Sequence, residues 1–173
     1  MLNAILCTTI NVPTFLEPLC SNIKKFSHNK NTVILIIGDM KTPFYTKSYC
    51  KKIAKKFKIE IIYFGMQEQN KFFQNKKYRT LYKIFPKNDA IRRLLGNIYL
   101  SSYNLERFIY IDDDNYICDK NNDFISSHSI VGKTITTKCA YSKNKWPNLY
   151  KYIETDEKMP LFPRGYPWNF RNI

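Results

Sequence analysis

The chain has 173 residues, of which 44% are hydrophobic and 16% aromatic, so it can bury the core of a single domain and is not a disordered chain. The 28 Lys and Arg residues against 14 Asp and Glu give a net charge of +14 at pH 7, which favours anionic partners such as nucleotides, nucleic acid or a membrane surface. The charge has a second explanation, because the chain is rich in the residues that AT-rich codons specify.

The cysteines and the hydropathy pattern indicate in which cellular compartment the protein is expected. Five cysteines at irregular spacing include no CxxC pair, which argues against a disulfide framework and against a zinc site. The first residues lack the basic and apolar regions of a signal peptide, and no run reaches the roughly 18 apolar residues of a membrane span. We therefore expect a cytoplasmic protein, with peripheral contact to an anionic membrane as an option that its charge leaves open.

Apolar and β-branched runs predict strands over 2–10, 32–37 and 59–64 in the first part of the chain. Helices are predicted between them, from about residue 14 to 26 and over 44–57, where lysines surround an apolar face. The run 32–37 is apolar almost throughout, which is typical of a parallel strand that is buried on both faces.

The second part of the chain starts with an aromatic and polar stretch, 65–84, which shows no clear period and predicts an irregular excursion. A helix capped by Asn88 or Asp89 comes next, and then a strand over 108–111. The apolar face of that helix is predicted to comprise Ile91, Leu94, Leu95, Ile98 and Tyr99. The alternation of strands and helices predicts an α/β fold with an open, mostly parallel, doubly wound sheet. A further strand is predicted over 131–139, in a mixed or antiparallel part of the sheet.

Polar clusters follow three of the predicted strands: residues 8–11 (TTIN), Gly38 with Asp39, and residues 112–115 (DDDN). In an open α/β sheet, ligands bind beyond the carboxyl ends of the strands. Three strand ends with ligand-binding side chains predict a binding site at this edge of the sheet.

The acidic run Asp112-Asp113-Asp114 has no basic neighbour in the sequence. If the run is extended, Asp112 and Asp114 point to the same side, and two oxygen ligands at that spacing suit Mn²⁺ or Mg²⁺. Mg²⁺ usually takes only one or two protein carboxylates and completes its shell with phosphate oxygens, so a metal here predicts a phosphate-bearing ligand. The alternative is an exposed acidic turn in which Asp114 or Asn115 caps the next segment.

A buried strand that ends in a D-x-D motif resembles nucleotide-sugar transferases of the GT-A fold. Four segments, in their order along the chain, resemble more closely the STELLO/DUF288 family of glycosyltransferase-like proteins. They are CTTINVPT (7–14), VILIIGDMKTP (33–43), AIRRLLGNIYL (90–100) with IYIDDDN (109–115), and LFPRGYPWN (161–169). The resemblance covers nearly the whole chain. It departs from the family at Leu94, where the family pattern has an amide. The chain also ends soon after the fourth segment, where a GT-A enzyme continues into acceptor-binding elements, so we expect a truncated version.

The resemblance implies one GT-A-like nucleotide-sugar-binding domain over 1–173. It also implies a nucleoside-diphosphate sugar donor, with a UDP type favoured, and a divalent cation, Mn²⁺ or Mg²⁺. A hexosyl or pentosyl group would pass to a glycan, lipid or protein acceptor. The donor contacts it suggests are Thr8, Thr9, Asn11, Asp39, Lys41, Arg92 and Asp113, and the metal ligands it suggests are Asp112 and Asp114.

Each of these residues also has an ordinary structural interpretation: strand propensity for the threonines, a turn for Asp39, and solvent exposure for Lys41. Successive helical residues lie about 100° apart, so only one of Arg92 and Arg93 is expected to face the site, and Arg92 matches the family pattern better. Glu154, Asp156 and Glu157 are flanked by lysines, which favours a solvated face, and no residue is predicted as the catalytic base.

Three other functions remain open on the sequence. A sugar-phosphate nucleotidyltransferase would share the sheet and the metal, but it needs a glycine-rich phosphate loop that residues 8–14 lack. A basic nucleic-acid or membrane binder would use the charge, yet the lysines of 44–58 surround the helix and no nucleic-acid motif is present, so no specific nucleic acid is expected. The third is a non-catalytic remnant that binds a nucleotide without turnover.

Overall fold

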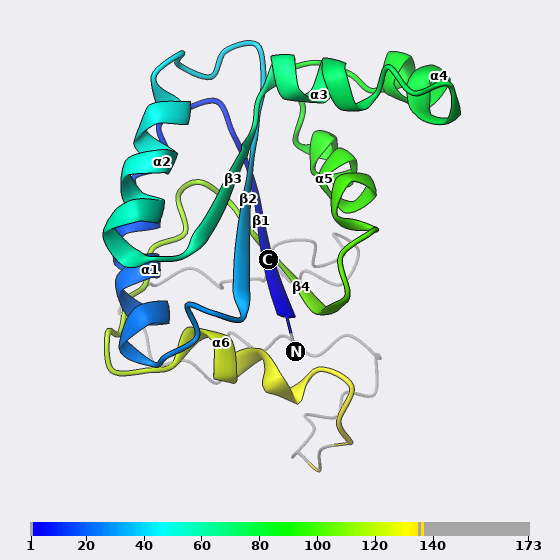
Figure 1. Cartoon of the computed structure of the whole chain (residues 1–173). Helices are drawn as coiled ribbons and strands as arrows, with labels where there is room; N and C mark the ends of the chain where they lie inside the picture. Colours follow the sequence, from blue (N-terminus) through cyan, green and yellow to red (C-terminus); the bar gives the residue numbers. More distant parts are fainter. Residues whose placement is uncertain (1, 135, 137–173) are drawn as a thin grey trace, which may run out of the picture. The chain divides into compact units, whose positions relative to one another are not determined.

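The computed structural model describes residues 2–134 and 136, and its helices and strands all lie in a compact unit formed by residues 1–132. Its four strands form one parallel sheet in the order β3-β2-β1-β4 (Figure 1). They are β1 (Leu2–Thr9), β2 (Thr32–Gly38), β3 (Glu60–Phe64) and β4 (Leu105–Ile111). The predicted α/β class with an open parallel sheet is confirmed, and β4 begins at residue 105 instead of 108.

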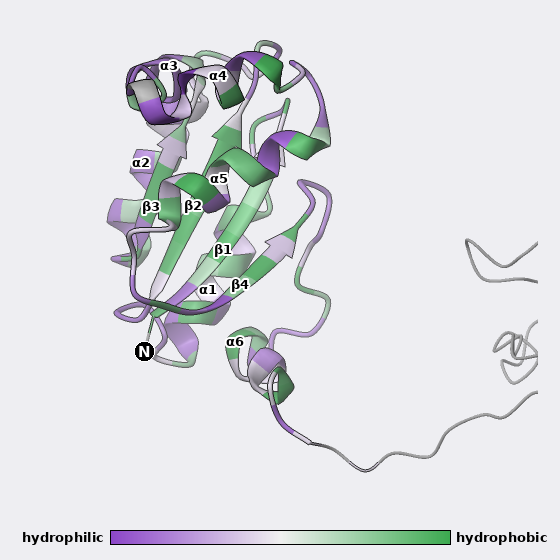
Figure 2. Cartoon of the chain, turned by 90° about the vertical axis from the view of Figure 1, so that its right-hand side faces the viewer, coloured by the Kyte–Doolittle hydropathy of each residue, from purple (hydrophilic) through white to green (hydrophobic). Residues whose placement is uncertain are grey.

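Helices cover both faces of the sheet (Figure 1). On one face, α1 (Leu16–Lys25), α2 (Thr46–Phe57) and the short α6 (Phe124–Ser127) pack against Ile5, Ile34 and their neighbours. On the other face, α5 (Arg93–Leu100) packs against Leu6 and Leu35. Successive side chains of β1 and β2 alternate between these two cores, which explains why both central strands are apolar almost throughout and green in Figure 2.

The stretch 65–84 is not irregular, and that prediction is wrong. It forms α3 (Met66–Phe72) and α4 (Lys76–Ile84). Aromatic packing holds these helices: the ring centroids of Phe73 and Tyr82 are stacked 4.8 Å apart, and those of Phe72 and Phe64 are 6.0 Å apart. Helices of 7 and 9 residues give only about two turns, too few for a period to stand out in the sequence.

The predicted helix after residue 88 is confirmed as a 3-10 turn, η1 (Ala90–Arg92), continued by α5, and the side chain of Asp89 caps it by accepting from Ile91 N at 2.8 Å. The predicted apolar face is only partly correct, because Ile91 and Leu94 are exposed. Gly96 explains the difference. A Cβ at this position would lie 2.6 Å from Cδ1 of Ile37, so the helix approaches the sheet along its glycine side.

The predicted strand over 131–139 is absent from 131–134 and from residue 136, and its other residues, together with 154–157 and the segment 161–169, lie outside the described residues. No helix among the described residues is long and apolar enough to cross a membrane.

Candidate functional site

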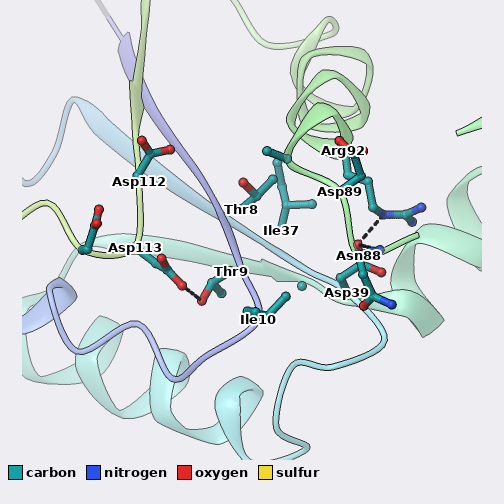
Figure 3. Close-up of a pocket in the computed structure, with 13 residues that line it drawn as sticks. Thr8, Thr9, Ile10, Ile37, Asp39, Asn88, Asp89, Arg92, Asp112 and Asp113 are labelled. Atoms are coloured by element: carbon teal, nitrogen blue, oxygen red, sulfur yellow. Dashed lines mark hydrogen bonds and ion pairs between the residues drawn. The ribbon is translucent and has the colours of Figure 1, made fainter. Parts of the chain in front are cut away.

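A cleft of about 330 Å³ lies at the carboxyl ends of β1, β2 and β4 (Figure 3). It is lined by residues 8–10, 37–39, 88–90 and 112–114, together with Arg92. The chain passes from β1 to β2 and β3 on one side, whereas β4 joins the sheet on the other side of β1. The cleft therefore lies at the point where the strand order reverses, the usual ligand position in an open α/β sheet. The three polar clusters predicted to meet there do meet.

The acidic run is a turn, so the geometry assumed for it in the sequence is wrong. β4 ends at Ile111, and Asn115 then closes the turn: its backbone N–H donates to Asp112 O at 3.1 Å, and its side-chain oxygen accepts from Asp112 N at 2.9 Å. The short amide side chain of Asn115 satisfies backbone groups that an extended strand would leave to a neighbour. Alternation along a strand therefore gives no reason for Asp112 and Asp114 to share a side.

Asp113, which follows β4, is hydrogen-bonded to the end of β1. Its Oδ2 accepts from the Thr9 hydroxyl at 2.7 Å (Figure 3). The same oxygen accepts from Asn11 Nδ2 at 3.2 Å. Thr9 is buried and its hydroxyl also accepts from Asn11 N at 2.9 Å. Hydrogen bonds among Thr9, Asn11 and Asp113 thus fix the acidic turn against the end of β1.

Arg93, the neighbour of the predicted Arg92, pairs with the acidic run. Its Nη2 lies 3.2 Å from Asp112 Oδ1, and the Asp112 side chain is 64% exposed. Arg93 thus compensates the charge of one of the three carboxylates of the turn, that of Asp112. The turn therefore remains acidic.

Arg92 is only 2% exposed and forms a buried ion pair with Asp39, with 3.3 Å between Nε and Oδ2. Its Nη1 donates to Pro86 O at 3.0 Å, and its Nη2 donates to Oε1 of Gln69. With these donors engaged inside the protein, Arg92 supports the wall of the cleft and pairs with Asp39 instead of the acidic run.

Asp39 connects β2 to the loop before α5. Its Oδ1 accepts from Met40 N and its Oδ2 from Asn88 N, both at 2.7 Å. Gln69 strengthens this corner because it donates to the carbonyls of Gly38 and Phe64 at 2.7 Å. Sequence reasoning missed Gln69 and Asn88, and no spacing or motif around either amide distinguishes it from the other polar residues of the chain.

The remaining predicted residues differ in their relation to the cleft. Thr8 lines it, whereas Asn11 and Lys41 are exposed and lie outside its lining. Cys7, one residue before Thr8, is buried in the core, where burial raises the pKa of its thiol far above the usual range and the charges of Asp113 and Asp112 raise it further.

Metal ligands are few in this part of the molecule. Among residues 2–134 and 136, no three His, Cys, Asp or Glu side chains converge on one point. The two histidines are engaged elsewhere. His128 donates to the carbonyl of Phe124 in α6 at 2.8 Å, and His28 donates to Asp123, the N-cap of α6, at 2.8 Å. Asp112 and Asp114 are exposed and line the cleft. Two such carboxylates fit Mn²⁺ or Mg²⁺, which complete their shells with phosphate and water.

No protein-family model matches this chain, and no curated protein matches it. The functional argument therefore depends on the chemistry of the cleft.

Proposed function

We propose that the cleft binds the nucleoside diphosphate of a nucleotide sugar together with a divalent cation, and that the protein is a GT-A-like glycosyltransferase. The observation that supports this is the difference between the two ends of the cleft. At one end Arg92 balances the charge of Asp39 and leaves Asp89 as the one further carboxylate of the lining, whereas at the other end the turn carries three carboxylates, of which Asp112 pairs with Arg93. A neutral nucleoside suits the first end, and a diphosphate carried with a cation suits the second.

The nucleoside end offers few but fixed contacts. Oδ1 of Asp39 accepts one backbone hydrogen bond and retains a second lone pair for a hydroxyl of ribose or an N–H of a base. Ile10 and Ile37 supply apolar surface beside it. Because Arg92 and Asn88 hold the Asp39 carboxylate, it needs no reorganisation when the nucleoside binds.

At the acidic end, Asp112 and Asp114 would hold Mn²⁺ or Mg²⁺, which when bound neutralises the diphosphate and stabilises the charge that develops on the departing nucleotide. Asp113 keeps the turn in place through Thr9 and Asn11. Arg93 lies beside Asp112 and can donate to a phosphate oxygen. In the reaction, the oxygen of an acceptor hydroxyl forms a bond to the anomeric carbon of the sugar and gives up its proton to water, while the bond from that carbon to the diphosphate oxygen breaks and the nucleoside diphosphate leaves.

Isothermal titration calorimetry with UDP and GDP, each with and without Mn²⁺, tests this proposal. We expect a nucleotide to bind more tightly when Mn²⁺ is present, and we expect the double variant Asp112→Asn/Asp114→Asn to lose this dependence. Glu60→Gln is the matched control, because it also removes a carboxylate but lies at the amino end of β3, away from the cleft. Failure of the wild-type protein to bind either nucleotide in the presence of Mn²⁺ would rule the proposal out.

A further inference from the structure

Four large apolar side chains are exposed on the two loops that follow β1 and β2. They are Ile10, Met40, Phe44 and Tyr45, which we call the apolar rim. Ile10 lines the cleft, and Met40 follows the cleft residue Asp39 directly, so the rim lies beside the opening of the cleft. Clustered exposed apolar side chains are uncommon on soluble proteins and mark surfaces that bind a partner or a membrane.

The loops that carry the rim are fixed by hydrogen bonds. The Thr42 hydroxyl donates to Thr9 O at 2.6 Å and accepts from Asp39 N at 2.7 Å, which joins the second loop to the end of β1. Thr46 N donates to Pro43 O at 3.0 Å, immediately before α2. Phe44 therefore lies on a loop that is already ordered, so binding of a partner to Phe44 carries little further entropy cost for the loop.

The shape of the rim favours a bilayer as that partner. Phe44 is 94% exposed, so almost all of its ring is free to insert between lipids. Aromatic side chains such as Tyr45 suit the level of the lipid headgroups. Single-stranded nucleic acid would stack on Phe44 and Tyr45, but it would leave the aliphatic Ile10 and Met40 in water.

Positive charge accompanies the rim. Lys41 is exposed within the same loop, and α2, which begins at residue 46, carries further lysines on its exposed surface. These are Lys47, Lys51, Lys52, Lys55 and Lys56. Two of them are paired with carboxylates, Lys47 with Glu68 at 2.5 Å and Lys56 with Glu17. Lysines near a membrane are attracted to anionic lipid headgroups, and the net charge of +14 adds to this attraction.

We propose that the apolar rim docks the protein on an anionic membrane surface, with Phe44 inserted between the lipids and Lys41 among their headgroups. This inference does not rest on the nucleotide proposal, because Phe44, Tyr45 and Lys41, which carry it, lie outside the lining of the cleft. Where both hold, the donor is presented at the membrane surface and a lipid-borne acceptor can reach it.

Cosedimentation of the full chain with vesicles tests the rim. We expect stronger partition to phosphatidylcholine vesicles that contain phosphatidylglycerol than to phosphatidylcholine alone. Phe44→Ser should lower the partition coefficient about tenfold, because burial of one phenylalanine is lost. Lys41→Glu should lower it about fivefold or more on the anionic vesicles. Val131→Ser is the control, since Val131 is also exposed but follows the 3-10 turn η2 (His128–Ile130) and lies outside the rim.

Three results would overturn the proposal: equal partition to both kinds of vesicle, partition of Phe44→Ser equal to that of the wild-type protein, or an equal loss in Val131→Ser. Binding of single-stranded DNA that Phe44→Ser weakens, without any binding to vesicles, would assign the rim to nucleic acid instead. Calorimetry with UDP and Mn²⁺ on Phe44→Ser keeps the two proposals apart, because nucleotide affinity is expected to be unchanged.

Discussion

Two neighbouring arginines have opposite roles in this protein. Arg92 is buried and holds Asp39, Gln69 and the Pro86 carbonyl, whereas Arg93 is partly exposed and holds Asp112 and the carbonyl of Ala90. The sequence predicted that only one of the two would face the site and favoured Arg92. Helical spacing alone did not reveal that Arg92 would pair with Asp39, a buried carboxylate 53 positions earlier, and Arg93 with the acidic run.

Replacing the buried arginine should be the more damaging change. Arg92→Met leaves the Asp39 carboxylate buried without its positive partner, and we expect a loss of about 3–5 kcal/mol in the free energy of unfolding. Arg93→Met removes an exposed pair and should cost less than about 1 kcal/mol. Urea unfolding followed by circular dichroism measures both, and equal losses would contradict the role assigned to Arg92.

Asp123 predicts a pH dependence of stability. Burial raises the pKa of its carboxyl, but hydrogen bonds from Ser126 and His28 outweigh burial and hold the pKa below its ordinary value of 3.8. A depressed carboxyl pKa contributes stability above the ordinary value, and this contribution is lost as the pH falls through the folded-state pKa. Asp123→Asn should therefore be less stable than the wild-type protein at pH 7, and the two unfolding midpoints should converge below about pH 4. A constant difference from pH 7 to pH 3 would disprove this role.

At the scale of elements, the sequence predicted best where burial is complete. β1 and β2 are apolar because both faces are covered, and their bounds were predicted to within one residue. α3 and α4 were missed because each is only about two turns long, too short for a period to stand out in the sequence. The exposed face of α5 was misplaced because the closest approach to the sheet occurs at Gly96, which adds no apolar signal to the sequence.

The contact at Gly96 can be tested by a double-mutant cycle. A Cβ there would lie 2.6 Å from Cδ1 of Ile37, so Gly96→Ala should destabilise the protein by about 1–2 kcal/mol even though alanine favours the helix. Ile37→Val removes that methyl group. The double variant should therefore be more stable than the sum of the two single changes predicts, by about 1 kcal/mol. Additive losses would contradict the packing described for α5.

At the scale of the whole molecule, the cleft combines residues that are far apart in the chain. Thr9 and Asp113 are 104 positions apart, yet one hydrogen bond joins them. The topology of a parallel sheet was enough to predict that the ends of β1, β2 and β4 meet. The partners of each side chain were not predictable, because they depend on the turn at Asn115 and on the loop before α5, and neither has a sequence period.

The cysteines report on global unfolding. Cys7, Cys20 and Cys50 are buried in one core, and burial raises the pKa of Cys20 and of Cys50 to about 12. Cys118 is exposed. With iodoacetamide at pH 8, mass spectrometry should show rapid labelling of Cys118, whereas the three buried thiols should be labelled only at the rate of global unfolding. Labelling of Cys20 or Cys50 as fast as that of Cys118 would contradict the described core.

The most direct test of the nucleotide cleft is an NMR measurement with paramagnetic Mn²⁺ in the presence of UDP. We predict strong broadening of the backbone amide signals of Thr9 and of residues 112–114, UDP-dependent shifts at Asp39 and Asn88, and an unaffected signal for Glu60 at the amino end of β3. Asp112→Asn/Asp114→Asn should abolish the broadening at Thr9. Broadening that leaves residues 112–114 untouched, or no change at Asp39 and Asn88 when UDP is added, would contradict the account.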